Sequence, residues 1–470
     1  MIKTIHYQLE NDSPLDQYII EFIFNILGYP AKKVTSNPDF YYGNLALGPA
    51  KKLSTNGFII IEPNQNDLIW NELVENDSKI AEITNKIPFD LIHAIGAFLT
   101  DKVNQNLSED SYDCDQLLLF VKSFQASNQI ANFPIVNLYL NFLKKIFEEV
   151  FKGSGLPLWP EGFKAAIGLS HDVDSPDKYA ILAAPLILKN RSLKENLYFN
   201  YKRFKALINR IKDSNPNDFW LFSQIMAAEA KYGFSSTFFV CSANRFDSYG
   251  SSEDVLYDIK RSNFQKVFSE ILHNQFEIGL HTSYNACDEA NRFVLEKKKL
   301  EGFVKTKVYG SRHHYWHLGD NSNQTFINQI KSGLEYDTSL AFNESIGFRR
   351  NVALPFYIWD SRNRTVSKLL ELPVFLMDGN FFSHKGANTV NAMKEIVKFI
   401  SIIKATNGLG VVDWHVRTSF PGNKTYQEWG KCYLELLDYL SQDKEIWVTN
   451  LRNLQIWLEQ RNQKLKEMVD

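Results

Sequence analysis

Residues 165–174 read Ala-Ala-Ile-Gly-Leu-Ser-His-Asp-Val-Asp. The first five residues are small or apolar, which is typical of a strand buried on both faces of a parallel sheet. After Ser170 the run changes to a histidine and two aspartates, side chains that a sheet cannot bury without partners. This stretch therefore predicts a core strand whose carboxyl end carries polar chemistry.

The same pattern, an apolar strand that ends in polar side chains, returns three times further along the chain. Phe-Glu-Ile-Gly-Leu leads into residues 281–285, Lys-Val-Tyr-Gly leads into residues 311–317, and Gly-Val-Val-Asp-Trp ends at His415. In a parallel (β/α) barrel the carboxyl ends of the strands converge on one face, which carries the active site. We therefore expect the four polar segments to share one site.

Short apolar strands alternate with longer amphipathic helices from residue 165 onward, which indicates parallel βαβ units. The fold class expected is α/β, a distorted (β/α) barrel preceded by a smaller α/β N-terminal domain. The strands are expected at residues 165–170, 235–241, 276–281, 307–312, 334–339, 370–374, 409–415 and 446–449. The barrel domain would span 165–470, with a basic insertion at about 178–213.

The first 150 residues form the expected accessory domain, and the Gly- and Pro-rich stretch 151–164 is the expected linker. Helical patterns cover 15–27, 90–100 and 136–151, and an apolar run at 57–62 predicts a strand. Its two histidines are isolated, so no chemistry is assigned to this part. Presenting a substrate and shielding one barrel edge are both compatible with it.

The composition of the chain excludes some classes of function. The chain has 470 residues, 52 basic and 54 acidic side chains, and a formal net charge of −2, so it carries no global electrostatic footprint for nucleic acid. The four cysteines are far apart and lack C-x-x-C pairing, which favours reduced, mostly buried thiols over disulfides or a cysteine zinc site. No apolar leader or membrane-spanning run is visible, so a cytoplasmic protein is expected.

The polar residue types at the strand ends predict a metal-assisted hydrolase. Asp172 and Asp174 are separated by one residue, so on an extended segment both carboxylates point to the same side and need a cation between them. One carboxylate would bind a divalent metal while the other accepts a proton from water. His281 offers a nitrogen ligand, Arg312 a charge-assisted bond to the free carboxylate, and His415 a proton for a leaving amine.

At these residues the chain resembles the polysaccharide deacetylase family, also called NodB-homology or carbohydrate esterase family 4. The resemblance lies in Asp172-Val-Asp174, His281-Thr-Ser-Tyr-Asn285, the Arg312 loop, Tyr336-Asp-Thr-Ser339 and the late His415, in that order. It implies Asp172 as general base, Asp174 and His281 as metal ligands, Arg312 as orienter of the base and His415 as general acid. The long N-terminal extension, Leu-Pro-Leu-Trp-Pro before the first strand and the segment 347–360 resemble one branch of the family.

One residue departs from the family pattern. The usual second metal histidine, four residues after the first, is Asn285, and an amide oxygen is a much poorer zinc ligand than imidazole. His314 is the preferred substitute, with His313 and His317 behind it. Weaker metal binding is one alternative, and a decayed metal site in a protein that binds glycans without cutting them is the other. Zinc is the expected metal, with cobalt and nickel as alternatives.

The predicted function is removal of acetyl groups from a carbohydrate, N-acetyl rather than O-acetyl. Residues expected to contact the substrate are Asn285, Tyr315, Trp316, Asp337, Arg349 and Trp414. For Asp337 a strand cap, and for Arg349 an ion pair, are equal alternatives. A second alternative function is a sugar-nucleotide glycosyltransferase in which Asp172-Val-Asp174 is a D-x-D motif that holds a diphosphate through a metal.

The segment 178–213 contains nine Lys or Arg but only Glu195 and Asp213 as acids, interleaved with aromatic and aliphatic residues. This pattern suits a helix on an anionic lipid surface or an acidic glycan, and a basic helix packed on the barrel by its apolar side is the simpler alternative. A lipid-linked saccharide held near a membrane is the corresponding hypothesis for substrate and location.

Overall fold

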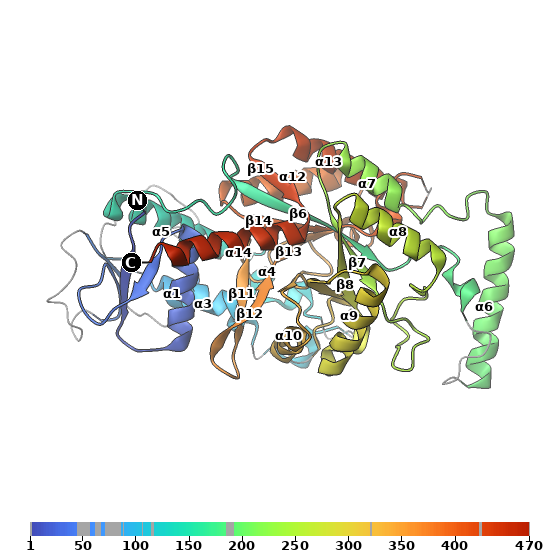
Figure 1. Ribbon diagram of the computed structural model, residues 1–470, viewed down its shortest axis with the longest axis horizontal. Coiled ribbons are helices and arrows are strands. Elements are labelled where there is room, and N and C mark those ends of the chain that lie inside the picture. The colour runs from blue at the N-terminus through green and yellow to red at the C-terminus, as the bar shows by residue number, and fades with distance from the viewer. Residues whose placement is uncertain are drawn as a thin grey trace.

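The computed structural model describes residues 2–44, 57–61, 67–70, 86–87, 89–105, 107–113, 117–184, 192–319, 322–422 and 425–469. Two sheets organise these residues, a small one near the N-terminus and a large one that begins at residue 165 (Figure 1). Among the described helices, none is both long and apolar enough to cross a membrane. Cys241, Cys287 and Cys432 are free and buried, as expected, and Cys114 lies outside the described residues.

The small sheet has five parallel strands in the order β2-β1-β3-β4-β5. Its strands are β1 (Ile5–Leu9), β2 (Ala31–Lys33), β3 (Phe40–Tyr42), β4 (Ile59–Ile61) and β5 (Lys86–Ile87). The helices of this part are α1 (Pro14–Leu27), α3 (Leu91–Leu99), α4 (Phe124–Ser127) and α5 (Ile135–Phe151). The expected helices at 15–27, 90–100 and 136–151 are confirmed as α1, α3 and α5.

Local signals fix the ends of α1. The Ser13 side chain accepts a hydrogen bond from the Asp16 backbone N–H, which satisfies a donor that the first turn leaves unpaired. Gly28 ends the helix in the left-handed conformation (φ 81°), where a residue without Cβ is not strained. The helix then buries its apolar face against α3 and α5.

The large sheet runs in the order β11-β12-β10-β9-β8-β7-β6-β14-β13, and β15 pairs with the first half of β6. Its strands are β6 (Ala165–Val173), β7 (Thr237–Cys241), β8 (Glu277–Thr282), β9 (Gly310–His313), β10 (Tyr336–Asp337), β11 (Phe356–Asp360), β12 (Thr365–Glu371), β13 (Val374–Met377), β14 (Leu409–Asp413) and β15 (Ile446–Thr449). Every described pairing is parallel except β11 with β12. The β6 residues are all buried, as expected for a central strand of a covered parallel sheet.

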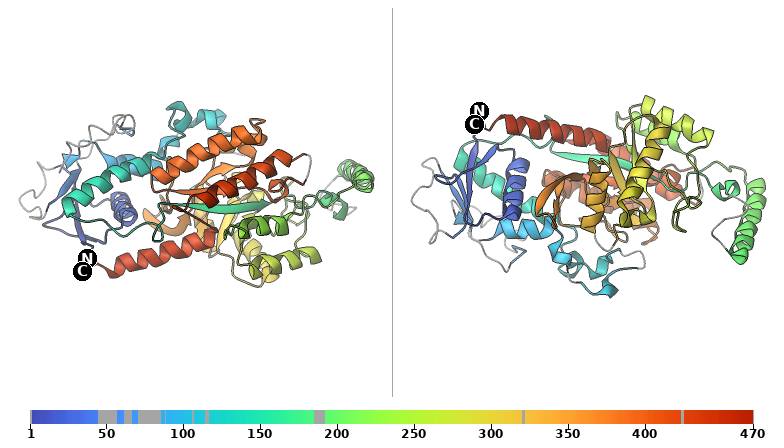
Figure 2. Two further views of the ribbon diagram at one scale, coloured as in Figure 1. Left: turned by 90° about the horizontal axis from the view of Figure 1, so that it is seen from above. Right: turned by 60° about the horizontal axis from the view of Figure 1, so that its bottom comes forward.

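Helices cover the outer face of this sheet (Figure 2). The helices of this part of the chain are α6 (Leu193–Lys212), α7 (Phe222–Ala230), α8 (Ser262–His273), α9 (Ala290–Val304), α10 (Ser322–Lys331), α11 (Gly379–Phe382), α12 (Thr389–Ala405), α13 (Gln427–Gln442) and α14 (Leu451–Glu467). Helix α6 is the exception, because it stands apart from the sheet. The predicted fold class, a distorted α/β barrel with a smaller α/β part before it, is confirmed.

The sheet curls but does not close by regular strand pairing. The backbone N–H of Val374 donates to the Leu340 carbonyl (3.2 Å), and that of Gly347 donates to the Phe375 carbonyl (3.0 Å). The irregular segment after β10 thus borders β13, at the opposite end of the strand order. This curvature brings strand ends that are distant in sheet order toward one mouth.

The prediction of a single strand at 370–374 is wrong. Residues up to Glu371 belong to β12, which pairs with β10 and β11, whereas Val374 starts β13, which pairs with β14. Pro373 lies between them, and proline cannot donate the backbone hydrogen bond that a continuous central strand needs. The chain therefore leaves one end of the sheet and joins the other.

Helix α14 ties the two parts of the chain together. In Figure 1 it runs from the large sheet to the N-terminal part, and the two chain ends lie close together. Arg461 on this helix donates to the backbone carbonyls of Pro157 (2.7 Å) and Leu156 (3.0 Å), and Asn462 accepts from Asn25 on α1 (2.8 Å). Buried apolar residues of both parts form one continuous core.

Candidate active site

The polar strand ends meet in one cavity of about 250 Å³. Asp172 and Asp174 come from the end of β6, His281 from β8, and His415 from the residues after β14. The full lining is Asp172, Asp174, His281, His313, His314, Tyr315, Trp316, Asn343, Met377, Asp378, Gly379, Ser383, His384, His415, Arg417 and Trp429. The convergence expected for the carboxyl ends of parallel strands therefore occurs.

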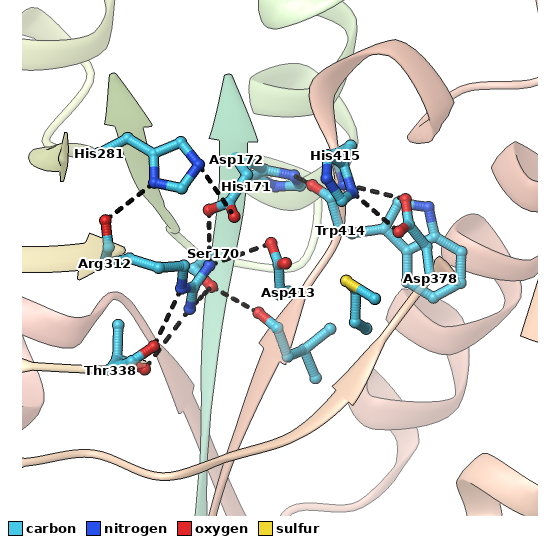
Figure 3. Close-up of polar contacts among 12 residues, drawn as sticks. Ser170, His171, Asp172, His281, Arg312, Thr338, Asp378, Asp413, Trp414 and His415 are labelled. Atoms are coloured by element: carbon cyan, nitrogen blue, oxygen red, sulfur yellow. Dashed lines mark hydrogen bonds and ion pairs between the residues drawn. The ribbon is translucent and has the colours of Figure 1, made fainter. Parts of the chain in front are cut away.

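Arg312 is fully buried beneath this cavity and holds Asp172 (Figure 3). Its Nη1 lies 2.8 Å from Asp172 Oδ1, its Nη2 donates to Ser170 Oγ (2.8 Å), and its Nε donates to the Thr338 carbonyl (3.1 Å). Two acceptors on β6 and one residue just after β10 thus fix the guanidinium plane, and the contact with Asp172 is a charge-assisted hydrogen bond. Gly310, on the same strand, lets the Tyr336 ring pack against it, because a Cβ there would lie 1.8 Å from that ring.

A second carboxylate faces the same guanidinium. Asp413 Oδ1 lies 3.0 Å from Arg312 Nη1, an ion pair without hydrogen-bond geometry, and Asp413 is fully buried. Burial and the nearby charge of Asp172 raise the pKa of Asp413 to about 8. Asp413 is therefore neutral near pH 7, so it does not compete with Asp172 for the positive charge of Arg312.

Asp174, His281 and His314 form a group that could hold a metal ion, with their ligand atoms all within 4.8 Å of one another. Asp174 Oδ1 lies 3.2 Å from His281 Nε2 and 3.5 Å from His314 Nε2. Two ligands of a tetrahedral ion bound at roughly 2.0–2.2 Å are roughly 3.4 Å apart, which these distances match. The donor set, one carboxylate and two imidazoles, therefore fits a zinc-type ion.

The surroundings of His281 prepare it as a ligand. Its Nδ1 must donate to the Arg312 carbonyl (2.9 Å), because a carbonyl oxygen can only accept. Nε2 therefore faces Asp174, and its lone pair becomes available when the imidazole loses its second proton. Such an outer hydrogen bond is the usual way to fix the tautomer of a metal-binding histidine. Asp174 Oδ1 and His314 Nδ1 are among the buried polar side-chain atoms of the described residues that have no hydrogen-bond partner.

A second group, Asp172, Asp413 and His415, also has metal-ligand spacing. Arg312 Nη1 already contacts both of its carboxylates, at 2.8 and 3.0 Å. A buried guanidinium repels a cation at this position. The group with Asp174 is therefore the better metal site.

The pKa values of the metal-binding group reflect the same geometry. Burial alone would lower the pKa of His281, but Asp172 and Asp174 raise it to about 9. Burial lowers the pKa of His314 to about 4, so its imidazole is neutral. Burial would raise the pKa of Asp174, but His415, His281 and His314 bring it well below its usual value.

His415 is held between two carboxylates. Its Nδ1 lies 2.8 Å from Asp378 Oδ1, its Nε2 lies 3.0 Å from Asp174 Oδ2, and its backbone N–H donates to Asp378 Oδ2 (3.0 Å). Burial by itself would lower the pKa of His415, but Asp378 and Asp174 raise it well above its usual value. The imidazolium is thus the stable form, as an acid catalyst requires.

His171 supports the site from behind and does not line it. Its Nδ1 donates to the Trp414 carbonyl (2.6 Å), and its Nε2 lies 2.8 Å from Glu229 Oε1. Tyr433 donates to the same Glu229 oxygen (2.6 Å). This fully buried network fixes the backbone one residue before His415.

Two of the expected substrate contacts line the cavity and four do not. Tyr315 and Trp316 both have φ 57°, a rare left-handed backbone for residues with a side chain, which is typical of functional sites. Tyr315 is 48% exposed, while Trp316 is buried with the Arg312 guanidinium 5.3 Å from its ring.

The other four expected contacts lie elsewhere. Asp337 is fully buried and accepts from Ser339 and Gln329, and Trp414 is fully buried against Tyr433. Arg349 forms an ion pair with Asp101 (3.2 Å). Asn285 lies in the turn after β8, outside the lining of the cavity and outside the group around Asp174.

Asp378 is the main site residue that the sequence reasoning missed. It follows β13 directly, so it obeys the same rule of a polar residue at a strand end. The strand was expected to end at Val374, three residues before β13 ends at Met377. Treating Pro373 as a break would have placed Asp378 with the other strand-end residues.

Fold and site together define a class, an α/β barrel protein with an Asp/His/Arg centre at its strand ends. No family model and no curated protein matches the chain. Solved structures that match include polysaccharide deacetylases, the family that the motifs resemble. A candidate polysaccharide deacetylase from Mycobacterium smegmatis matches with 14% identity and TM-score 0.44, covering 65% of this chain and 93% of that chain.

Two further solved structures also match. A candidate polysaccharide deacetylase from Pseudomonas aeruginosa PAO1 has 11% identity and TM-score 0.42, covering 67% of this chain and 97% of that one. A CE4-family pseudoenzyme from Bacillus anthracis has 10% identity and TM-score 0.31, covering 62% of this chain and 65% of that one. At such values the site geometry carries the functional proposal.

Proposed function

We propose that the chain is a metal-dependent hydrolase that removes acetyl groups, N-acetyl rather than O-acetyl, from a carbohydrate. The observation that carries the proposal is that two carboxylates at the end of β6 have different contacts. Asp172 is held by Arg312 at 2.8 Å, whereas Asp174 faces His281 and His314 at 3.2 and 3.5 Å. One carboxylate is arranged to take a proton and the other to bind a cation.

Two different residues carry out the two proton transfers. Asp172, which accepts a charge-assisted hydrogen bond from Arg312, takes the proton of the attacking water. His415, kept protonated by Asp378, donates a proton to the leaving amine. Asp174, His281 and His314 would hold a divalent cation, zinc first and cobalt or nickel next, which when bound supplies Lewis-acid polarisation of the acetyl carbonyl. Acetate and a free amine are the products.

The first test is acetate release from an N-acetylglucosamine oligomer, and from an acetyl ester, with zinc, cobalt or nickel added. Loss of the base in Asp172→Asn should lower the rate by about 1,000-fold, within the range typical of general-base catalysis. Asp443→Asn, at an ion pair with Lys404 remote from the cavity, is the matched control and should retain the rate. We further propose to test a lipid-linked acetylated saccharide beside the soluble oligomer.

The two alternatives give different results in the same assay. In the glycosyltransferase alternative the D-x-D aspartates would hold a diphosphate through a metal, but Asp172 Oδ1 is paired with Arg312. Release of UDP from a sugar donor without acetate would nevertheless establish the transferase. Oligosaccharide binding with no acetate under any of the three metals would establish a non-catalytic relative.

A further inference from the structure

Helix α6 (Leu193–Lys212), in the basic insertion after β6, has an environment unlike that of the other long helices. None of its residues is buried. It stands clear of the barrel in all three views of Figures 1 and 2. A surface helix normally covers its apolar side with the core of its own domain, so the question is what covers this side of α6.

The side of α6 that contacts the protein is narrow and well anchored. Arg203 donates to the backbone carbonyls of Leu182 (3.0 Å) and Ala184, and the Phe199 ring lies 6.1 Å from that of Phe246. Asp213, just after the helix, pairs with Lys178 (2.7 Å). A capping box formed by Ser192 and Glu195 starts the helix. The helix is thus held in place without burying its apolar residues.

The apolar side chains of α6 lie on one face, and that face is exposed. Leu193, Leu197, Phe204 and Ile211 follow the four- and seven-residue spacing of a helix face, and they are 79, 64, 62 and 76% exposed. Tyr201 and Leu207 extend the same face, with 62 and 46% exposed. At about 100° per residue, the centre of this face lies roughly 135° from Phe199 and roughly 95° from Arg203 around the helix, so most of the face is turned away from the side that contacts the protein, and Leu207 borders that side.

The charge of α6 indicates what kind of partner covers its apolar face. The helix has six Lys or Arg and one Glu, whereas the whole chain has a net charge of −2. Lys194, Lys205 and Lys212 lie within about 20° of one another around the helix and border the apolar face. A second copy of α6 would bring these like charges together, which disfavours self-association.

We propose that α6 docks on an anionic membrane surface, with its apolar face in the acyl boundary and its lysines against the phosphate headgroups. Helices of this kind lie in the interface plane, held by buried apolar area and by attraction to anionic lipid. Asp174 and α6 both follow the carboxyl end of β6, so docking sets that end of the barrel near the membrane. The proposal does not depend on the hydrolase activity.

Co-sedimentation of the full chain with phosphatidylcholine vesicles, with and without phosphatidylglycerol, tests the proposal. We expect binding to the anionic vesicles only, and a loss of about a hundredfold in the partition coefficient when Lys194, Lys205 and Lys212 are all changed to Glu. Leu197→Asn with Phe204→Asn should lower it at least about tenfold. The matched control reverses three exposed lysines on α9 and α12, Lys298, Lys394 and Lys398, and should bind like the unchanged chain.

Three outcomes would overturn the proposal. The first is equal binding of the lysine variant and the unchanged chain to anionic vesicles. The second is a dimer in sedimentation velocity that Leu197→Asn with Phe204→Asn turns into a monomer, because a second copy would then cover the face. The third is capture by a soluble acidic polysaccharide that needs the lysines but not Leu197 and Phe204. Circular dichroism and acetate release from a soluble oligomer check that each variant is folded.

Discussion

Replacing Asp378 by Asn should move the alkaline limb of the pH profile to lower pH. Asp378 Oδ1 lies 2.8 Å from His415 Nδ1, both groups are buried, and the Asp378 charge is the largest of the influences that raise the pKa of His415. Two unit charges about 4 Å apart interact by about 4 kcal/mol at an effective dielectric constant of about 20. At about 1.4 kcal/mol per pKa unit, this is about 3 units as an upper limit.

The expected shift is smaller than this limit, about 1–3 units. Asp174 remains 3.0 Å from His415 Nε2, and the Asn side chain can still accept a hydrogen bond from Nδ1. The sign follows from the role of His415 as an acid. Activity is lost as the pH rises through its pKa, so a lower pKa brings the loss at a lower pH.

Two measurements check this prediction. One is kcat/KM for acetate release as a function of pH, and the other is an NMR titration of the His415 imidazole, which does not require activity. Asp39→Asn makes the same change at a buried carboxylate of the N-terminal sheet, paired with Lys3 at 2.8 Å, and should leave both curves in place. An unchanged His415 titration in Asp378→Asn would refute the reasoning.

Three further predictions concern the metal group and the buried arginine. In a chelator competition assay, His314→Ala should weaken zinc binding by at least about a hundredfold, whereas Asn285→Ala should change it by no more than about twofold. Equal effects of the two variants would show that His314 is not a ligand. Because the pKa of His281 is about 9, zinc uptake near pH 7 should release a proton, and the affinity for zinc should rise with pH up to about 9. Calorimetry in buffers of different ionisation enthalpy measures this proton release. Without metal, the stability that protonated His281 contributes is fully present below about pH 6.5 and is lost as the pH rises through about 9. Arg312→Met leaves two buried carboxylates without their partner, and the free energy of unfolding in urea should fall by about 3–5 kcal/mol at neutral pH; a loss below about 1 kcal/mol would contradict the ion-pair account.

Much of the barrel was predictable because burial on both faces leaves a strong trace in the sequence. The strands β6, β7, β8 and β14 are short apolar runs, and all four lie within a few residues of their expected positions. The pair β11 and β12 was missed in part because its exposed residues break the apolar pattern, as in Thr365–Glu371, where the first residues are exposed. An antiparallel hairpin at the end of a parallel sheet has no βαβ signal.

The sequence by itself determined which polar side chains stand at the ends of buried strands, since an apolar run that stops at Asp172, His281 or His415 is readable along the chain. Only the tertiary structure decided which of them meet. The choice of His314 over Asn285 beside Asp174, and the pairing of Asp378 with His415, depend on how far the sheet curls and on the crossing of the chain at Pro373 from one end of the sheet to the other. Distances between strand ends are set by side-chain packing across the whole sheet, and no local pattern of residues encodes them.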